Sequence, residues 1–533
     1  MEANCTYLAY SQTNYFSDLV IDYLNADEKL QPFYRYGVSK AGIKQSIEAR
    51  RLFPQQRAVL VQELKKQYDA LPKTKALGNN MELLNNENTF TITTAHQPNI
   101  FTGPLYFIYK ILHTIELAAT LKKQLPEYNF VPVYYMGSED ADLDEIGNIK
   151  IDGVAYGWQT DQTGAVGRMK VDNAFLQLIA QMHGQLGVLP FGNELIDTFR
   201  RVYSKGKTIQ SATLELVNDL FGKYGLVVLI PDNATLKKLF IPVVEKELRE
   251  GFSHKAVSAT IAALEKHHKP QAGGRELNLF YLKDNKRERI EKVDNRYKID
   301  ALGLKFSEDE IIKELYDYPD RFSANVILRG AFQETVLPNI AFIGGGGELA
   351  YWLELKSVFE AVDIPYPVLL LRNSFLVIEE KWVKKINELG IKAADLFQPA
   401  FEIMNSIVAG RSSKQFALNG ELKHIENLYT QIKTLAGAVD ETLHDHVIAL
   451  KVKALKQLRE LEKKMLRAEK RKFEVEQHNL GKLQSALFPG NNLQERVENF
   501  SLFYSKYGIE FIDMLLKYSL AMEQEFGILQ LNS

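Results

Sequence analysis

The pattern of apolar and polar residues between residues 89 and 136 predicts a strand, a loop, a helix and a second strand. Residues 89–95 and 130–136 are rich in the β-branched and aromatic residues that favour strands. Between them, apolar residues recur at three- and four-residue steps from Leu105 onward, which predicts an amphipathic helix. Pro104 suits the first position of that helix, because its ring fixes φ and no N–H is needed there. We therefore expect a right-handed βαβ crossover.

The same alternation of short apolar runs and helical periodicity continues along the chain, which predicts a mainly parallel sheet with helices packed on it. The predicted strands are residues 225–230, 340–343 and 366–371, and the predicted helices are residues 173–186, 210–223, 233–248 and 348–359. Segments with a different pattern divide the chain. We expect an N-terminal helical segment (1–85), a core in three pieces (86–147, 206–250 and 330–375), insertions between them (148–205 and 251–329) and a C-terminal helical region (376–533).

The C-terminal helical region carries a coiled-coil pattern over about residues 421–477. Apolar residues recur there at alternating three- and four-residue steps, and burial of such a seam predicts a homodimer. The alternative is a hairpin of two helices, because Gly437 and the helix-start signal Asp440–Thr442 interrupt the pattern. Residues 451–472 hold ten Lys or Arg against three Glu, which we interpret as a solvated face rather than a nucleic-acid-binding one.

Length and composition restrict the classes of protein that fit. A chain of 533 residues is too long for one core, so two or three domains are expected. The formal net charge of −2 gives no reason to expect a nucleic-acid partner. Cys5 is the only cysteine, which excludes an internal disulfide framework and favours a reducing, cytoplasmic location. The sequence has no signal-peptide pattern and no apolar run of ~20 residues, so no membrane partner is expected.

Four polar side chains follow the first predicted strand, in the loop that precedes the helix: His96, Gln97, Asn99 and Thr102. In open α/β sheets, ligands bind at the carboxyl ends of the strands, and free N–H groups at a helix start favour anions. The loop is therefore a candidate binding site. The alternative is a helix entry made of ordinary turn residues. Neither the dinucleotide pattern GxGxxG nor the phosphate-loop pattern GxxxxGK(S/T) is present.

An acidic stretch follows the second predicted strand, with five Asp or Glu residues among residues 139–145. Acidic residues are favoured at a helix start, so a solvated helix N-terminus is one interpretation. A site for Mg²⁺ or for a substrate ammonium group is the other, with Asp140 and Asp142 as its candidate ligands. The adjacent His267 and His268 point apart on a helix, so we expect them at the surface rather than in a metal site.

A run of four glycines, Gly344–Gly347, follows a short apolar run and precedes a predicted helix that begins at Glu348. Glycine lets the backbone approach a ligand closely. This second strand–loop–helix junction resembles the first, and we expect the two loops to meet at a topological switch point of the sheet. Arg275 follows a Gly-Gly pair ahead of another predicted strand. It is a candidate anchor for a carboxylate or phosphate, and a plain surface arginine is the alternative.

Short motifs of specific sequence occur in order from about residue 90 to the C-terminus. They are His96-Gln97, Thr102–Tyr106, Glu139-Asp140, Asp142, Asp144-Glu145, Asn278–Tyr281, Asn325–Arg329, Gln333-Glu334, Leu337-Pro338, Gly344-Gly345, Gly347-Glu348, Ala350–Trp352 and Leu493–Arg496. Together they resemble the motifs of one family, the cysteine-adding enzymes of bacillithiol biosynthesis, called cysteine ligase BshC. The departures from the family pattern are His96 in place of Gln, Ala141 in place of His, and Gly330 and Gly346 in place of Pro.

The resemblance implies an α/β fold with a Rossmann-like parallel sheet core related to nucleotidylyltransferases and class I aminoacyl-tRNA synthetases. Two insertions and a dimerising C-terminal coiled coil complete that fold. It implies a ligase that adds L-cysteine to glucosaminyl malate, as the last step in the synthesis of bacillithiol. The cysteine carboxyl group would be activated as an acyl-adenylate or acyl-phosphate, so ATP or another nucleotide, with Mg²⁺, is the cofactor to consider. The alternatives are a nucleotidylyltransferase of other specificity and a non-catalytic coiled-coil scaffold.

The site residues expected from position and resemblance form three sets. The catalytic set is His96, Asn99 and Thr102, the nucleotide-binding set is Gly344, Gly345 and Gly347, and the substrate-binding set is Gln97, Gly103, Tyr106, Asp140, Asp142, Arg275, Asn278, Arg329 and Glu348. The residues His96 to Asn99 lie where the related transferases carry HxGH, with Asn99 at the second His. No resident metal ligand set is predicted.

Overall fold

The computed structural model describes residues 2–413 and 417–532. Residues 1, 414–416 and 533, which belong to the predicted N-terminal segment and C-terminal region, lie outside the described residues. The chain forms two compact units, one of residues 3–376 with 492–529 and the other mainly of residues 377–491. Within the described ranges, no helix is both long enough and apolar enough to cross a membrane.

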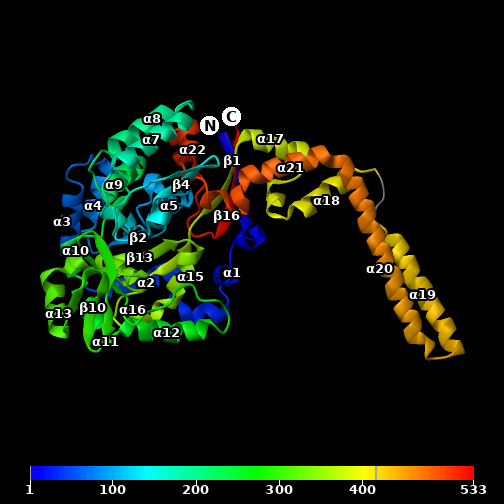
Figure 1. The fold of residues 1–533 in the computed structure, drawn as a ribbon, viewed down its shortest axis with the longest axis horizontal. Coiled ribbons are helices and arrows are strands. Elements are labelled where there is room, and N and C mark those ends of the chain that lie inside the picture. Colours follow the sequence, from blue (N-terminus) through cyan, green and yellow to red (C-terminus); the bar gives the residue numbers. More distant parts are fainter. Residues whose placement is uncertain (1, 414–416, 533) are drawn as a thin grey trace. The chain divides into compact units, whose positions relative to one another are not determined.

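The first unit is built on a five-stranded parallel sheet (Figure 1). Its order is β14-β13-β2-β3-β6, with strands β2 (Thr89–His96), β3 (Asn129–Met136), β6 (Val227–Leu229), β13 (Asn339–Gly344) and β14 (Val368–Leu371). From β2 the chain adds β3 and β6 on one side, and later adds β13 and β14 on the other. The order therefore reverses between β2 and β13, which is the topological switch point of the sheet.

The two loops predicted to meet do lie side by side, because β2 and β13 are direct neighbours. Thr94 pairs with Ile343 in the parallel register, so His96 and Gly344 end their strands at the same edge of the sheet. Every residue of both strands is buried, as expected for central strands of a parallel sheet covered on both faces. The predicted adjacency of the two strand–loop–helix junctions is confirmed.

Helix α5 (Tyr106–Gln124) follows β2 as predicted, but it is buried on nearly all sides rather than amphipathic. One face packs on the sheet, where Leu117 and Leu121 join a core with residues of β2 and β13. On another face, the His113 ring contacts the carbonyl oxygen of Ala521 at 2.8 Å. The amphipathic prediction is wrong because the chain that covers this face comes 408 positions later in the sequence.

Two predicted helix boundaries differ from the structure. The first helix begins at Tyr106, after Pro104 and the N-cap residue Leu105. The helix predicted at residues 233–248 is two helices, α10 (Ala234–Lys238) and α11 (Ile241–Glu250). Pro242 lies in the first turn of α11. Proline cannot donate the backbone hydrogen bond that would continue the preceding helix, so it favours a new helix start.

The helix predicted at residues 348–359 is also broken into two. α15 (Gly346–Glu354) ends before Leu355, and α16 (Lys356–Glu360) begins directly after that residue. Trp352 in the last turn of α15 stacks on Phe342 of β13, with ring centroids 4.4 Å apart. This packing holds α15 against the sheet, so the N-terminus of the helix starts at the glycine turn that follows β13.

The two insertions carry small antiparallel sheets and short helices. The first contains β4 (Asn148–Ile151), β5 (Val154–Gly157), α7 (Asn173–Leu186) and α8 (Gly192–Val202), and it is followed by α9 (Ile209–Phe221). The second contains α12 (Phe252–Leu264), β7 (Leu279–Lys283), β8 (Lys286–Arg289), β9 (Glu291–Val293), β10 (Arg296–Ile299), β11 (Leu304–Phe306), α13 (Glu308–Asp317) and β12 (Phe322–Ala324). His267 is exposed as predicted. His268 is not, because its side chain lies 3.3 Å from Asp22 and is only 8% exposed.

The remaining elements come from the two ends of the chain and from the core. They are β1 (Glu2–Ala9), α1 (Asp18–Leu24), α2 (Lys40–Leu52), α3 (Arg57–Gln67), α4 (Lys75–Leu83), α6 (Leu143–Ile146), α14 (Val326–Val336), β15 (Ser374–Ile378), α22 (Ser501–Tyr507), α23 (Ile509–Lys517) and β16 (Glu525–Asn532). Strands β1, β16 and β15 form a separate three-stranded sheet in that order. Residues 492–529, which lie in the predicted C-terminal region, belong to the first unit.

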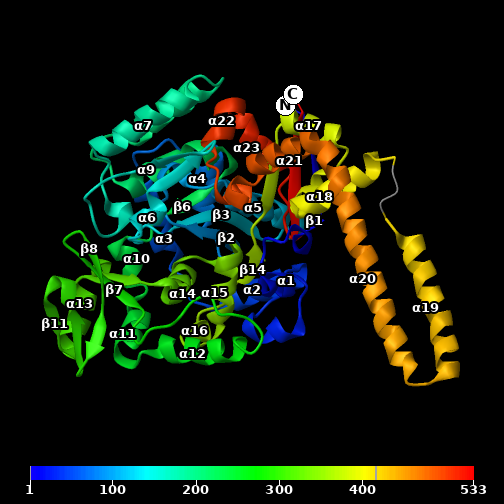
Figure 2. The ribbon, with the colours of Figure 1, turned by 45° about the vertical axis from the view of Figure 1, so that its right-hand side comes forward.

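The second unit contains a long helical hairpin. Its helices are α17 (Glu380–Leu389), α18 (Ala400–Arg411), α19 (Asn419–Val439), α20 (Leu443–Lys470) and α21 (Glu474–Leu487). α19 and α20 lie side by side over their length, as both views show (Figures 1 and 2). The chain turns between them at Asp440, whose carboxylate accepts a hydrogen bond from the Thr442 N–H at 2.9 Å. The predicted hairpin alternative is therefore confirmed.

Candidate functional site

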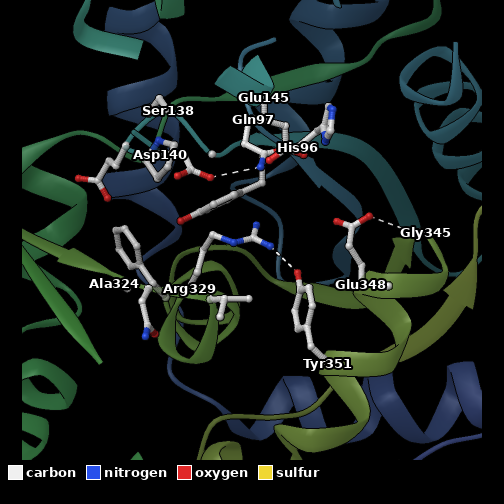
Figure 3. A pocket seen from close by; sticks show the side chains of 18 of the residues that line it. His96, Gln97, Ser138, Asp140, Glu145, Ala324, Arg329, Gly345, Glu348 and Tyr351 are labelled. Carbon is white, nitrogen blue, oxygen red and sulfur yellow. Dashed lines mark hydrogen bonds between the residues drawn. The ribbon is translucent and has the colours of Figure 1, made fainter. Parts of the chain in front are cut away.

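A cavity of about 840 Å³ opens at the carboxyl ends of β2, β3 and β13, at the switch point of the sheet (Figure 3). His96 reaches it from β2, Gly137 from the end of β3, and Gly345 from the turn after β13. Other walls come from α14, α15 and the β7-β8 hairpin of the second insertion. This is the position at which open α/β sheets bind ligands.

His96 lies at the end of β2 with its ring between Tyr106 and Phe107, at centroid distances of 5.3 Å and 5.7 Å. Burial, assisted by the positive charges of Lys110 and Arg329, holds the pKa of the imidazole well below its usual range. The ring is therefore neutral at pH 7. Within the part of the chain that the structure describes, its buried Nε2 atom has no hydrogen-bond partner. Such an atom is available to a ligand in the cavity.

A polar wall faces His96 across the loop. The Gln97 side-chain amide donates a hydrogen bond to Asp140 at 3.2 Å (Figure 3). Asp140 in turn lies 4.0 Å from the Arg287 guanidinium, which stacks 3.9 Å from the centroid of the Phe280 ring. One acidic residue of the predicted stretch is thus placed at the cavity and held by neighbours on both sides.

Glu139, next to Asp140, ties the cavity wall to α10 of the core and to β12 of the second insertion. Its carboxylate accepts hydrogen bonds from Lys237 of α10 and, at 3.1 Å, from the Ser323 hydroxyl of β12. Lys237 is 5% exposed and also donates to the Asp320 carbonyl at 3.0 Å. A buried ion pair with this many hydrogen bonds fixes geometry more than it adds stability.

The glycine turn is held in place by a second ion pair. Glu348, in the first turn of α15, accepts a hydrogen bond from the Gly345 N–H at 2.8 Å (Figure 3) and pairs with Lys110 of α5. Lys110 is 2% exposed and donates to the Ala95 carbonyl at 3.0 Å, so it joins α15 to the end of β2. Burial lowers the pKa of Lys110, and the Glu348 carboxylate opposes this shift.

Arginine side chains dominate the remaining lining. Arg329 extends from α14 and donates a hydrogen bond to the Tyr351 hydroxyl at 2.6 Å (Figure 3). Arg372, directly after β14, pairs with the buried Glu495 at 2.7 Å. Its buried Nε atom has no hydrogen-bond partner among the described residues. A β-carbon placed on Gly345 would lie 3.6 Å from this nitrogen, so the nitrogen is directed toward the glycine turn.

The charge balance of the lining favours an anionic ligand. The cationic side chains are Lys110, Arg275, Arg287, Arg289, Arg329, Arg372 and Arg496, and the acidic ones are Glu139, Asp140, Glu145 and Glu348. Several of the acids are paired with cations inside the wall, as described above, which leaves the arginines in excess. The N-terminus of α15 adds partial positive charge at the same place.

The structure brings most of the predicted site residues together. Those that line the cavity are His96, Gln97, Tyr106, Asp140, Arg275, Arg329, Gly345, Gly347 and Glu348. Those outside the lining are Asn99, Thr102, Gly103, Asp142, Asn278 and Gly344. Asp142 is exposed and caps α6, accepting a hydrogen bond from the Glu145 N–H at 3.1 Å. Gly344 is the last residue of β13.

The second half of the His96 loop turns away from the cavity. Asn99 and Thr102 are buried, and Thr102 and Gly103 have positive φ angles of 70° and 69°. The amide of Asn499 donates to the Phe101 carbonyl at 2.9 Å and also to the Gly103 carbonyl, which holds the loop in this conformation. The HxGH-like register therefore places the histidine, but not the asparagine, at the cavity.

Among the lining residues that sequence reasoning did not assign to the site are Lys110, Tyr351, Arg372 and Arg496. Lys110 carried a detectable signal, because it is a cation within an otherwise apolar stretch of α5. Tyr351 and Arg496 lie in motifs that resemble the family pattern, but the sequence analysis assigned neither residue a role in the site. Arg372 directly follows a core strand, which is the position where binding residues gather in such sheets.

The described residues hold no group of three His, Cys, Asp or Glu side chains suited to a metal ion. A nucleotide phosphate, in contrast, fits the chemistry of the lining: the glycine turn admits close approach, and the α15 N-terminus and the arginines supply donors. The orphaned Arg372 nitrogen beside Gly345 is the observation that supports this fit.

Fold and cavity together define a Rossmann-like protein with a cationic cavity at its switch point and a C-terminal helical hairpin. Residues 1–373 match the family description "Bacillithiol biosynthesis BshC, N-terminal Rossmann-like domain", and residues 375–531 match the C-terminal coiled-coil domain of the same family. The chain belongs to the BshC family.

Relatives in the family are similar over nearly their full length. A protein of Flavobacterium johnsoniae named "Putative cysteine ligase BshC" is 40% identical over 533 residues, covering 99% of this chain and 100% of that protein. A protein of the same name from Bacillus cytotoxicus is 25% identical over 540 residues, covering 96% and 98%. A solved structure titled as an arginyl-tRNA synthetase of Campylobacter jejuni matches with a TM-score of 0.22 at 11% identity, which is too low to inform on the fold.

Proposed function

We propose that the chain is a ligase that joins the carboxyl group of L-cysteine to the amino group of glucosaminyl malate, forming bacillithiol in the last step of its synthesis. The excess of arginine and lysine at the switch-point cavity is the observation that carries this proposal. Glucosaminyl malate bears two carboxylates, and guanidinium groups bind carboxylates through paired hydrogen bonds. The names of the relatives support the ligase class.

The cavity offers opposite charges for the two ends of that substrate. Arg329 and Arg275 would bind the malyl carboxylates. The Asp140 carboxylate would accept a hydrogen bond from the amino group of the sugar. Asp140 is partly satisfied by Gln97, so it can accept a further donor. This assignment places the nucleophilic nitrogen near the His96 side of the cavity.

Amide formation from a free carboxylate needs activation, because hydroxide or oxide is a poor leaving group. We propose that a nucleoside triphosphate activates the cysteine carboxyl group: ATP would give an acyl-adenylate with release of pyrophosphate, or transfer of the terminal phosphoryl group would give an acyl-phosphate with release of the nucleoside diphosphate. Gly345 and Gly347 with the N-terminus of α15 would contact the phosphates. Neutral His96 would donate a hydrogen bond to the oxygen on which negative charge develops.

We also propose that the protein is a homodimer through the α19–α20 hairpin. Several large apolar side chains of the hairpin are exposed, among them Leu428 (52%), Leu435 (70%) and Leu461 (47%). Burying them in a second copy would remove apolar surface from water, which is favourable by about 25 cal/mol per Å².

The proposal is tested by incubating the purified protein with L-cysteine, glucosaminyl malate and each of the four common nucleoside triphosphates. Mass spectrometry after thiol labelling should detect bacillithiol, together with one cleaved nucleotide. Pyrophosphate release without amide product would favour a nucleotidylyltransferase instead. A protein that binds neither substrate nor nucleotide would support the scaffold alternative. In cells, deletion of the gene should cause glucosaminyl malate to accumulate.

A further inference from the structure

Asn278 is fully buried and lies behind the cavity wall rather than in it. Its side-chain amide uses all of its hydrogen-bonding capacity. The Nδ2 atom donates to the Ser253 hydroxyl at 2.7 Å and to the Arg275 carbonyl at 2.9 Å. The Oδ1 atom accepts from the Arg275 N–H at 3.1 Å and from the Asn325 amide at 2.8 Å. No capacity is left for a ligand.

Two of these bonds hold both polar groups of the Arg275 backbone. The side chain of Arg275 is exposed, lines the cavity and forms no ion pair within the described residues. Arg275 ends the segment of residues 271–275. The start of this segment is held by the buried Glu354 carboxylate, which accepts a hydrogen bond from the Gln271 N–H at 2.6 Å. Gly273 and Gly274 lie between these two anchors, so the segment has little stiffness of its own.

The other bonds connect Asn278 to the helix that carries Arg329. Asn325 is the N-cap of α14, its side chain accepting from the Ile327 N–H at 2.9 Å. Its backbone N–H donates to the Asn278 carbonyl at 3.1 Å, and its own carbonyl accepts from the Arg329 N–H at 2.8 Å. One buried amide therefore contacts both Arg275 and the cap that starts the turn of Arg329.

Asn278 is itself anchored by an acidic residue of the core. Its backbone N–H donates to Glu247 of α11 at 2.9 Å, and the same carboxylate accepts from the Ser253 hydroxyl at 2.8 Å. Glu247 and Ser253 are both fully buried. The amide is therefore part of a buried hydrogen-bonded network that joins α11 of the core to the second insertion.

We propose that Asn278 is a positioning residue that fixes Arg275 at the cavity, in register with Arg329, so that the two guanidinium groups bind one anion with two separated acidic groups. The identity of that anion as glucosaminyl malate rests on the proposed function above. The positioning role rests on the hydrogen bonds alone. Asn278 contacts no ligand and acts through the backbone of Arg275.

The first test needs no ligand. Asn278→Ala should expose the Arg275 amide, and hydrogen exchange of a peptide covering residues 271–277 should become at least ~10-fold faster. Asn339→Ala is the matched control: Asn339 is also buried, with hydrogen bonds to Glu334 and Thr93, but lies outside the cavity lining. It should leave this peptide unchanged. Unchanged exchange in Asn278→Ala would overturn the proposal.

The second test measures affinity for glucosaminyl malate by calorimetry, per folded molecule. Asn278→Ala and Arg275→Ala should each weaken binding by about 10- to 100-fold, the scale for losing a hydrogen bond to a charged group. The double variant should bind no more weakly than Arg275→Ala alone, because both changes remove the same contact. Additive losses, or normal affinity in Asn278→Ala, would show that Asn278 is merely structural.

The two tests separate the positioning role from the proposed function. If the unchanged protein does not bind glucosaminyl malate, the substrate assignment fails, while hydrogen exchange still decides whether Asn278 holds Arg275. If Asn278→Ala does not fold, Ser253→Ala replaces it, because that change removes one partner of the Asn278 amide and leaves the amide in place. Ser253→Ala should cause faster exchange and weaker binding in the same direction, and the absence of both effects would overturn the proposal.

Discussion

Individual side chains around the cavity take their protonation state from what surrounds them. His96 is buried beside aromatic rings with cations nearby, so its ring is neutral. Tyr351 accepts a hydrogen bond from Arg329, which leaves its own proton free to be donated, and burial raises its pKa to about 12. At neutral pH, Tyr351 is therefore a hydrogen-bond donor toward a ligand, and the neutral His96 ring has one N–H donor and one acceptor nitrogen.

We predict that His96→Ala lowers turnover by about 10²–10³-fold, the scale for losing one donor to a developing negative charge. The melting temperature should fall somewhat as well, because the buried ring also packs against Tyr106 and Phe107. Turnover per folded molecule and melting are measured on one preparation. His424→Ala, an exposed histidine on α19, is the control. Normal turnover with a lower melting temperature would mean that His96 only supports the loop.

We predict that His113 makes the protein less stable as the pH falls. Burial lowers the pKa of His113 from 6.5 to about 4, so the unfolded chain binds more protons than the folded one between these values. Its contribution is intact above pH 6.5 and is lost as the pH falls toward 4, with a total of roughly 3 kcal/mol.

The change that isolates this effect is His113→Gln. A glutamine can reproduce the bonds to the Ala521 carbonyl and the Asn373 N–H without titrating. Urea unfolding at pH 7 and pH 4.5 should show a smaller loss of unfolding free energy in the variant than in the unchanged protein. Equal losses would assign the acid sensitivity to other groups, such as the buried His96.

At the scale of helices and strands, local pattern predicted the elements but not their surroundings. The strands β2 and β3 and helix α7 follow from periodicity and turn residues that lie within a few tens of positions. The adjacency of the two loops follows instead from the rule that ligand-binding loops of an open α/β sheet meet at its switch point. The burial of α5 could not be predicted, because the contact to Ala521 comes from the other end of the chain.

Only part of the cavity lining could be predicted, because local sequence identifies residues that follow core strands but not pairs that are distant in the sequence. His96 and the glycine turn were found, because each directly follows a core strand. Arg372 and its partner Glu495 are 123 positions apart, and nothing local indicates that they meet. Asn278 was predicted to bind substrate, and only the structure shows that it lies behind the wall rather than in the cavity lining.

The function of the glycine turn after β13 can be tested by placing side chains of increasing size at Gly345. Gly345 has an ordinary φ of −73°, and a β-carbon there would lie 3.5 Å from Glu348 and 3.6 Å from Arg372, which is normal contact. We predict that Gly345→Ala is largely active, whereas the larger Gly345→Val displaces these groups and lowers turnover by about 10²-fold. Circular dichroism should be unchanged for both. Full activity of the valine variant would show that the turn only connects β13 to α15.

For the whole molecule, the main question is what covers the apolar side chains of the α19–α20 hairpin. The hairpin buries Val447 and Leu455, so part of the predicted seam is used within one chain. Leu458 is half-buried and Leu461 is 47% exposed. The coiled-coil pattern therefore serves an intramolecular contact first, and only its exposed positions can serve a dimer.

We predict that Leu435→Asp combined with Leu461→Asp converts a dimer to a monomer, because both side chains are exposed within one chain. Leu458→Asp with Leu461→Asp should also give monomers, although Leu458 contributes to the hairpin itself. Light scattering measures the mass, and helical content is checked by circular dichroism. Lys453→Asp, at an exposed polar position, is the control. An unchanged dimer mass would move the interface elsewhere.

The return of residues 492–529 to the first unit has a consequence for the order in which the protein is made. A ribosome finishes the whole helical hairpin before Glu495 and Asn499 are synthesised. Yet Glu495 pairs with Arg372, and Asn499 holds the His96 loop. Until then Arg372 lacks the Glu495 carboxylate that pairs with it in the folded protein. The nascent Rossmann core must therefore wait, incomplete, for the last part of the chain. A message cut short after the hairpin would yield no working cavity, however well the earlier strands had formed.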